Sequence, residues 1–405
     1  MKLLEKLKLT PEEKKLIKQV FIVSLSISVL TVVIVWGIQR ISLKTASTEK
    51  MEENSEETDI IELYRAKSDD LLPIDIEAHK MAAEKYKETT PIKSIKHLLR
   101  ILSVERKNRK VMLDLATAYL KSGIYDKAKD MFEKLIEAGI SDSLMPQIMS
   151  RYGLTLFFLD RIDESMTYLE KTVTDFPGSA EAFCYLGQVK AAQNLASPEA
   201  EEYLRKAVDI NPRYSEGWYQ LARYYMKKPG ADSSDYLHAR KCLLRQLAIE
   251  PLNPKGHSRL GMVYFYLHQP YLADKSYQTA LALNEYDYNT HYNLGELYFT
   301  SFNDSKKALE EFKQAVRIKP DHVEANFKIG LISLENNMFK EAVQYFTKAL
   351  ERSPKNIRIL LQLGISYEKL SMTSEALNVY HRILSYDALN DVALQKIKLL
   401  SSGKR

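Results

Sequence analysis

The side chains that could do chemistry are few and scattered along this sequence. Its eight histidines are His79, His97, His238, His257, His268, His291, His322 and His381. His257 and His291 occupy equivalent places in successive repeats, and Glu296 follows the second of them closely. This spacing fits a metal-binding or acid–base role, and it also fits polar residues at a variable surface position. We favour the polar role.

Motifs that mark common catalytic and cofactor sites are absent from the sequence. It contains no HExxH, no GxxxxGK[ST], no GxSxG and no GxGxxG after a strand. Neither Cys184 nor Cys242 belongs to a CxxC pair, so we favour two separate thiols over a zinc site or a disulfide. The formal net charge of +5 is small, whereas nucleic-acid binding usually needs a concentrated basic face. We expect no enzyme activity, no cofactor, no metal and no nucleic-acid ligand.

The elements that carry these side chains repeat at intervals of roughly 34 residues. Only 13 prolines and 14 glycines interrupt the 405 residues, which favours long helices with short connections. Small and large side chains recur in register, and we predict that they pack the helices together: Gly187, Trp218, Gly261, Tyr264, Gly295, Tyr298, Ala308, Phe312, Gly330, Ala342, Phe346, Gly364 and Ala376. In this scheme the small residues let helices approach closely, and Tyr264, Tyr298, Phe312 and Phe346 fill the gaps between units.

The recurring pattern resembles the tetratricopeptide repeat family. Trp218, Leu221, Ala222 and Tyr225 follow the family's W-x2-L-G-x2-Y motif with one Gly-to-Ala change, and Leu294, Gly295 and Tyr298 follow its second part. The resemblance covers about four fifths of the chain. It implies an all-α, right-handed superhelical solenoid in which each unit is a helix A, a turn and a helix B.

The repeat pattern divides the chain into domains. A degenerate unit is predicted at 75–108, with helices near 75–88 and 91–103, and a C-terminal capping helix and tail at 391–405. Between them, 109–390 holds about eight units: 109–142, 146–179, 180–214, 215–253, 254–287, 288–322, 323–356 and 357–390. Extra residues at 228–234 predict a longer loop between the two helices of one unit.

An uncharged stretch at 20–38 predicts an N-terminal transmembrane helix. A cleaved signal peptide is the alternative, but no clear cleavage site follows the stretch directly. Lysines are concentrated in residues 1–19, so the positive-inside rule places that segment in the cytoplasm and the repeats on the extracytoplasmic side, the periplasm if the source is bacterial. Residues 39–74 are polar and acidic and predict a flexible linker. The overall plan resembles membrane-anchored, bacterial-type tetratricopeptide repeat proteins.

The resemblance also implies a groove lined by the A helices. The residues predicted to line this protein-binding groove are Phe157, Phe158, Tyr219, Arg223, Phe265, Tyr266, Tyr292, Glu296, Phe299, Phe327 and Lys369. Aromatic side chains suit peptide binding because they bury much area at low entropy cost. About half of these rings could instead pack between neighbouring A helices. Some family members hold the C-terminal carboxylate of chaperones with groove lysines and asparagines, but the corresponding positions here carry other residues, such as Tyr219 and Arg223.

These observations predict a membrane-anchored scaffold or adaptor that assembles partner proteins at the cell envelope. The alternative is a chaperone-like or recruiting subunit that delivers substrates to an envelope enzyme. The expected partners are other proteins or peptide segments, together with the lipid bilayer that would hold the N-terminal helix. The sequence does not determine the oligomeric state.

Overall fold

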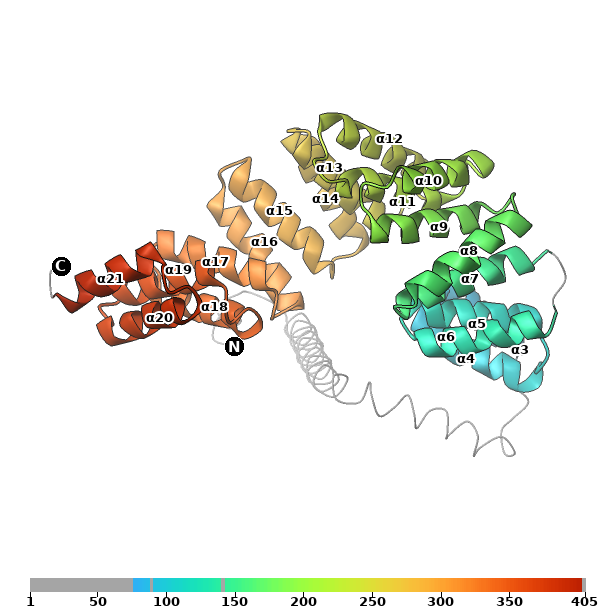
Figure 1. The fold of residues 1–405 in the computed structure, drawn as a ribbon, viewed down its shortest axis with the longest axis horizontal. Helices are drawn as coiled ribbons and strands as arrows, with labels where there is room; N and C mark the ends of the chain where they lie inside the picture. Colours follow the sequence, from blue (N-terminus) through green and yellow to red (C-terminus); the bar gives the residue numbers. More distant parts are fainter. Residues whose placement is uncertain (1–75, 88–89, 140–142, 403–405) are drawn as a thin grey trace, which may run out of the picture. The chain divides into compact units, whose positions relative to one another are not determined.

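All regular secondary structure in the described part of the chain is helical. The computed structural model describes residues 76–87, 90–139 and 143–402, and these ranges contain 19 α-helices and no β-strand (Figure 1). The predicted all-helical repeat fold is therefore confirmed for them. The membrane segment predicted at 20–38 and the linker predicted at 39–74 lie outside the described residues. Of the described helices, none is both long and apolar enough to cross a bilayer.

The helices occur in pairs, and we call the first helix of each pair A and the second B. The A helices are α3 (Ile76–Tyr86), α5 (Arg109–Lys121), α7 (Met145–Phe158), α9 (Ala180–Gln193), α11 (Ser215–Lys227), α13 (Pro254–Tyr266), α15 (Tyr288–Thr300), α17 (Val323–Glu335) and α19 (Ile357–Lys369). The B helices are α4 (Pro91–Val104), α6 (Tyr125–Glu137), α8 (Ile162–Asp175), α10 (Pro198–Ile210), α12 (Ser233–Ile249), α14 (Pro270–Leu283), α16 (Ser305–Ile318), α18 (Phe339–Arg352) and α20 (Thr373–Tyr386). A last helix, α21 (Asp391–Ser401), follows α20.

Each helix packs against the helices next to it in the chain. From α5 to α20 every A helix contacts its own B helix, and from α4 to α20 every B helix contacts the helix that follows it. Five pairs of successive A helices also contact one another, for example α7 with α9, whereas no two described B helices pack as closely. The units therefore approach each other most closely on the side formed by the A helices.

Local signals set the beginnings of the helices. Nine side chains accept a hydrogen bond from the backbone N–H three residues further on: Asn108, Ser179, Ser197, Asp232, Asn253, Asp304, His322, Asn356 and Asn390. Such caps satisfy one of the backbone donors that a helix leaves unpaired at its start. Five helices, among them α10 and α13, also have proline in the first turn, where its missing N–H costs nothing.

The turn between helices A and B repeats one backbone conformation. In six units a residue with positive φ ends helix A: Gly123, Asp160, His268, Asn303, Asn337 and Ser371, with φ between 52° and 78°. A left-handed residue reverses the chain in few residues, and for a non-glycine residue it costs about 1–2 kcal/mol. Gly123 adopts this conformation without strain, and Asp, Asn and His adopt it more readily than most residues, so Ser371 is the residue whose type suits the turn least.

Glycines in the A helices bring the two helices of a unit together. A Cβ atom would lie 2.6 Å from the Tyr277 ring if added to Gly261, 2.6 Å from Phe312 if added to Gly295, 2.5 Å from Phe346 if added to Gly330, and 2.7 Å from Tyr380 if added to Gly364. A Cβ atom added to Gly187 would likewise lie 2.7 Å from the Leu204 side chain. Ordinary carbon contacts are about 3.5–4.0 Å long. Each of these five units therefore places a glycine, which has no side chain, opposite a large side chain.

The predicted packing residues lie in the core, with one correction. Ala308, Ala342 and Ala376 are completely buried, and Tyr298 is nearly so, whereas Trp218 and Tyr264 are half-buried at the edge of a hydrophobic cluster. We expected Phe312 and Phe346 to fill gaps between units. Each ring instead lies inside its own hairpin, against the glycine of its own A helix, because that glycine opens the space.

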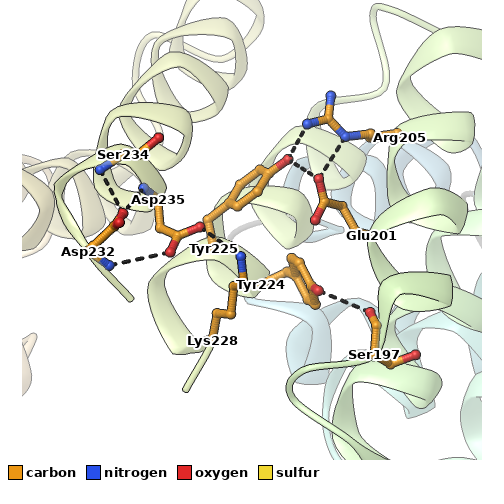
Figure 2. Close-up of polar contacts among 9 residues, drawn as sticks. All are labelled: Ser197, Glu201, Arg205, Tyr224, Tyr225, Lys228, Asp232, Ser234 and Asp235. Atoms are coloured by element: carbon orange, nitrogen blue, oxygen red, sulfur yellow. Dashed lines mark hydrogen bonds and ion pairs between the residues drawn. The ribbon is translucent and has the colours of Figure 1, made fainter. Parts of the chain in front are cut away.

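The extra residues at 228–234 are divided between a turn and a helix. We predicted a longer loop, but helix α12 begins at Ser233 and so takes in part of the insertion. Asp232 caps α12 through the backbone N–H groups of Ser234 and Asp235, and Lys228 forms an ion pair of 3.2 Å with Asp235 (Figure 2). These contacts hold the turn against the helix that it precedes.

Candidate functional site

The side chains of the A helices that contact neighbouring A helices or solvent form what we call the A-helix surface. Of the eleven residues predicted there, Phe158, Tyr266 and Lys369 are exposed. Seven are half-buried: Phe157, Tyr219, Arg223, Phe265, Tyr292, Glu296 and Phe299. Phe327 is a correction, because it is only 6% exposed and packs against Phe346 in the core. Its ring is further covered by the Arg358 guanidinium, 4.3 Å from the ring centre.

A polar network joins the first three A helices of the regular repeats. Arg151 of α7 donates to Thr117 of α5 over 2.7 Å and forms an ion pair of 2.8 Å with Glu181 of α9. Tyr185, one turn further along α9, donates its hydroxyl to the same carboxylate. Burial and the Glu181 charge raise the pKa of Tyr185 well above its ordinary value. The Arg151 charge is thus neutralised within the array.

A second pair neutralises the surface between α15 and α17. Lys328 forms an ion pair of 2.8 Å with Glu296, and its ammonium lies 5.1 Å from the centre of the Phe299 ring. Both charged side chains are less than a quarter exposed, so their attraction is screened less than that of a surface pair. Two predicted groove residues, Glu296 and Phe299, are therefore held by a lysine that the sequence alone did not single out.

The surface of α11 and α13 carries positive charge without such pairing. Arg223 donates to the side-chain oxygen of Gln220 over 2.8 Å, and Gln220 donates in turn to Glu216. Arg259 of α13 contacts the Met262 sulfur at 3.3 Å. Within the described residues, neither arginine has an ion pair with a carboxylate at 4.0 Å or less.

Two exposed rings at the edge of this surface are fixed by stacking. Phe158 lies 4.9 Å from Tyr125 with nearly parallel planes, and Tyr266 lies 4.7 Å from Tyr236 in the same way. In both cases an aromatic residue at the end of an A helix rests on a tyrosine of the B helix of the preceding unit. Rings held in this way have one face covered by the tyrosine, remain partly exposed, and lose little conformational entropy when a ligand covers them.

The histidines at equivalent places have a structural role that the sequence did not reveal. The His257 ring donates to the carbonyl of Pro251, and the His291 ring to the carbonyl of Glu285, each six residues earlier. Trp218 and Asn326 occupy the corresponding places in their own units and donate to Pro212 and Pro320. The fourth residue of these four units thus satisfies a carbonyl of the turn that precedes it.

Tyrosines of the A helices add a bond to the preceding unit. Tyr225 donates its hydroxyl to Glu201 of α10 over 2.8 Å and accepts from Arg205 (Figure 2). Tyr298 donates in the same way to Asp274 of α14. Tyr298, which was predicted only to fill a gap, and the motif residue Tyr225 therefore also fix the register of successive units.

The remaining chemically reactive groups are buried or dispersed. Burial raises the pKa of both thiols, that of Cys242 to about 11, so neither is ionised at neutral pH. Cys184 and Cys242 form no disulfide. Among the residues that the structure describes, no group of three or more His, Cys, Asp and Glu side chains is placed to hold a metal ion.

Comparison with known proteins matches several of these units. Family models described as tetratricopeptide repeat match residues 110–138, 258–321, 301–357 and 333–398. Anaphase-promoting complex subunit 3 of Schizosaccharomyces pombe is 24% identical over 266 residues, which are 57% of this chain and 38% of that protein. Tetratricopeptide repeat protein 5 of Bos taurus is 26% identical over 175 residues, 39% of this chain and 38% of that protein.

A solved structure of an APC/C hetero-tetramer, Cut9-Hcn1, has a similar fold. It superimposes with a TM-score of 0.54 at 16% identity, covering 77% of this chain and 59% of that one. At this identity the likeness concerns the fold alone. The chain also spans only 38% of the length of the curated relatives named above.

Proposed function

We propose, from the tetratricopeptide repeats that the chain carries, that it is an interaction scaffold whose A-helix surface binds other proteins. Tetratricopeptide repeat proteins in general mediate protein–protein interactions. The observation that supports this role most directly is the A-helix surface itself. Its aromatic and charged side chains are accessible or half-buried, and neighbouring side chains hold them in place before any ligand arrives.

Pre-organisation is what makes this surface suitable for binding. Phe158 and Tyr266 are fixed by stacked tyrosines, and Arg223 is fixed by Gln220. Ordering a flexible side chain costs about 0.5–1.5 kcal/mol on association, and that cost is reduced where the side chain is already ordered. Aromatic and arginine side chains are also the types that contribute most to protein interfaces.

We further propose that residues 20–38 anchor the scaffold in a membrane, with the repeats on the extracytoplasmic side. The support is the uncharged stretch itself and the lysines that precede it. A reporter that is active only outside the cytoplasm, fused after Arg405, should be active in cells. Activity only of a cytoplasmic reporter at the same position would reverse the orientation, and recovery of the full-length chain without membranes would refute the anchor.

Site-specific photo-crosslinking tests the binding face. A photoreactive phenylalanine analogue at Tyr266, on the A-helix surface, should capture partner proteins when cells are irradiated. The matched control is the same analogue at Tyr271, which is 79% exposed on the B helix α14 of the same unit. Capture from position 271 but not from 266 would place the binding face elsewhere. Captured proteins in fixed ratio favour a scaffold, and many weakly populated clients favour the chaperone-like alternative.

A further inference from the structure

The charges of the A-helix surface are unevenly compensated. Arg151 pairs with Glu181 in the first regular repeats, and Lys328 pairs with Glu296 further along. On α11 and α13, Arg223, Lys227 and Arg259 form no ion pair within the described part of the chain. We call these three residues the central cation cluster.

The members of the central cation cluster lie close enough to repel one another. Arg223 and Lys227 are separated by one helical turn and so share a face of α11. The pKa of Lys227 is lowered, first by burial and then by the charges of Arg223 and Arg259. The repulsion therefore acts across the two A helices, and an anion placed there would relieve it.

Arg223 also has hydrogen-bonding capacity that the fold leaves unused. Its Nε–H is buried and has no acceptor, and one of its terminal nitrogens donates to Gln220. Buried donors without an acceptor are rare in folded proteins and call for a missing partner, whether a water or a ligand. A guanidinium presents its donors in a planar fork that matches a carboxylate.

The carboxylate of Glu216 is not a direct counterion for this cluster. Glu216 reaches Arg223 only through the amide of Gln220. No carboxylate of the described residues is therefore paired directly with a cation of the cluster.

Apolar side chains flank the cluster on α13. Met262 touches Arg259, and Phe265 and Tyr266 follow one turn later in edge-to-face contact with each other. Tyr266 is 46% exposed. A ligand that alternates acidic and apolar groups would find a complement for both on the same helix.

We propose that the central cation cluster binds an acidic segment of a partner protein, with glutamate or aspartate side chains on Arg223 and Arg259 and an apolar residue on Tyr266. This inference rests on the proposed function and specifies the chemistry of the partner. A protein segment fits better than nucleic acid because the cluster is confined to two helices, and the flanking cations Arg151 and Lys328 are already paired.

Fluorescence anisotropy on the purified full-length chain in detergent tests this specificity. The probe is a fluorescein-labelled peptide of alternating glutamate and leucine, and its matched control has glutamine in place of glutamate. Arg223→Gln and Arg259→Gln should each weaken binding of the acidic peptide by about tenfold, as expected for the loss of one charged hydrogen-bonded contact. Arg245→Gln, at an exposed arginine on the B helix α12, should leave the affinity unchanged. Added salt should weaken binding of the acidic peptide.

Three outcomes would overturn the inference. They are equal binding of the glutamine peptide, unchanged affinity in both arginine variants, and stronger binding of a single-stranded oligonucleotide than of the acidic peptide. Circular dichroism of each variant checks that the helices are retained. Crosslinking from position 266 is independent of this assay, so partner capture without preference for the acidic peptide would reject the inference and leave the proposed function standing.

Discussion

Substitution of Gly295 by alanine should destabilise its repeat, although alanine is the better helix former. The added Cβ would lie 2.6 Å from the Phe312 ring, about 1 Å less than an ordinary carbon contact. Phe312 is fully buried, so its ring has no free space into which to rotate. Overpacking of this kind costs about 1–3 kcal/mol, and the gain in helix propensity returns about 1 kcal/mol. Because the enclosed ring cannot move aside, we take the upper part of the overpacking range, about 2–3 kcal/mol, which leaves a net loss of about 1–2 kcal/mol.

Urea unfolding followed by circular dichroism measures this loss, and hydrogen exchange localises it to α15 and α16. A double-mutant cycle separates the contact from other effects. In a Phe312→Ala background the Cβ has room, so Gly295→Ala should there become neutral or stabilising. Gly178, in the turn before α9, is a control for the added Cβ alone, because nothing lies within 4 Å of a Cβ at that position. If Gly295→Ala is as stable as the parent chain, the close approach does not govern the hairpin.

Three further predictions concern contacts that recur in the array. The pKa of His291 is raised because, against the effect of burial, the Glu311 carboxylate and a backbone carbonyl favour the charged ring. This stabilisation is present below the unfolded pKa of about 6.5 and is lost as the pH rises through the folded-state pKa. The substitution His291→Gln should therefore lower the free energy of unfolding more at about pH 5.5 than at about pH 8.5. An equal loss at both pH values would contradict this prediction. Ser371→Gly should stabilise the chain by about 0.5–1 kcal/mol in thermal unfolding, because Ser371 has a φ of 58°, and a lower melting temperature would show that the turn is not strained. Trp218→Phe should cost about 0.5–1.5 kcal/mol in urea unfolding, because it removes the donor to Pro212, and an unchanged midpoint would exclude that bond from the stability of the unit.

Much of the fold could be predicted from local features of the sequence. Asn108, Ser179 and Pro254 set the starts of their helices through contacts within a few residues. The recurrence of Gly295 and Ala308 with Phe312 in register indicated that helices approach closely, but it did not show that the Phe312 ring lies inside its own hairpin. The insertion at 228–234 was harder to place, since either a longer loop or a longer helix would accommodate it.

The sequence by itself determined the helices and their pairing, because caps, turns and size complementarity act between residues that are near one another in the chain. The tertiary structure alone decided which side chains the array leaves accessible. Phe327 and Tyr266 are both aromatic residues of A helices, yet the first is buried and the second is exposed. Charge pairing is likewise decided between units. Lys328 of one repeat forms an ion pair with Glu296 of the preceding repeat, whereas Arg223 forms no ion pair with a carboxylate of the described residues. Such contacts depend on how separate helices are juxtaposed, and no local pattern records that.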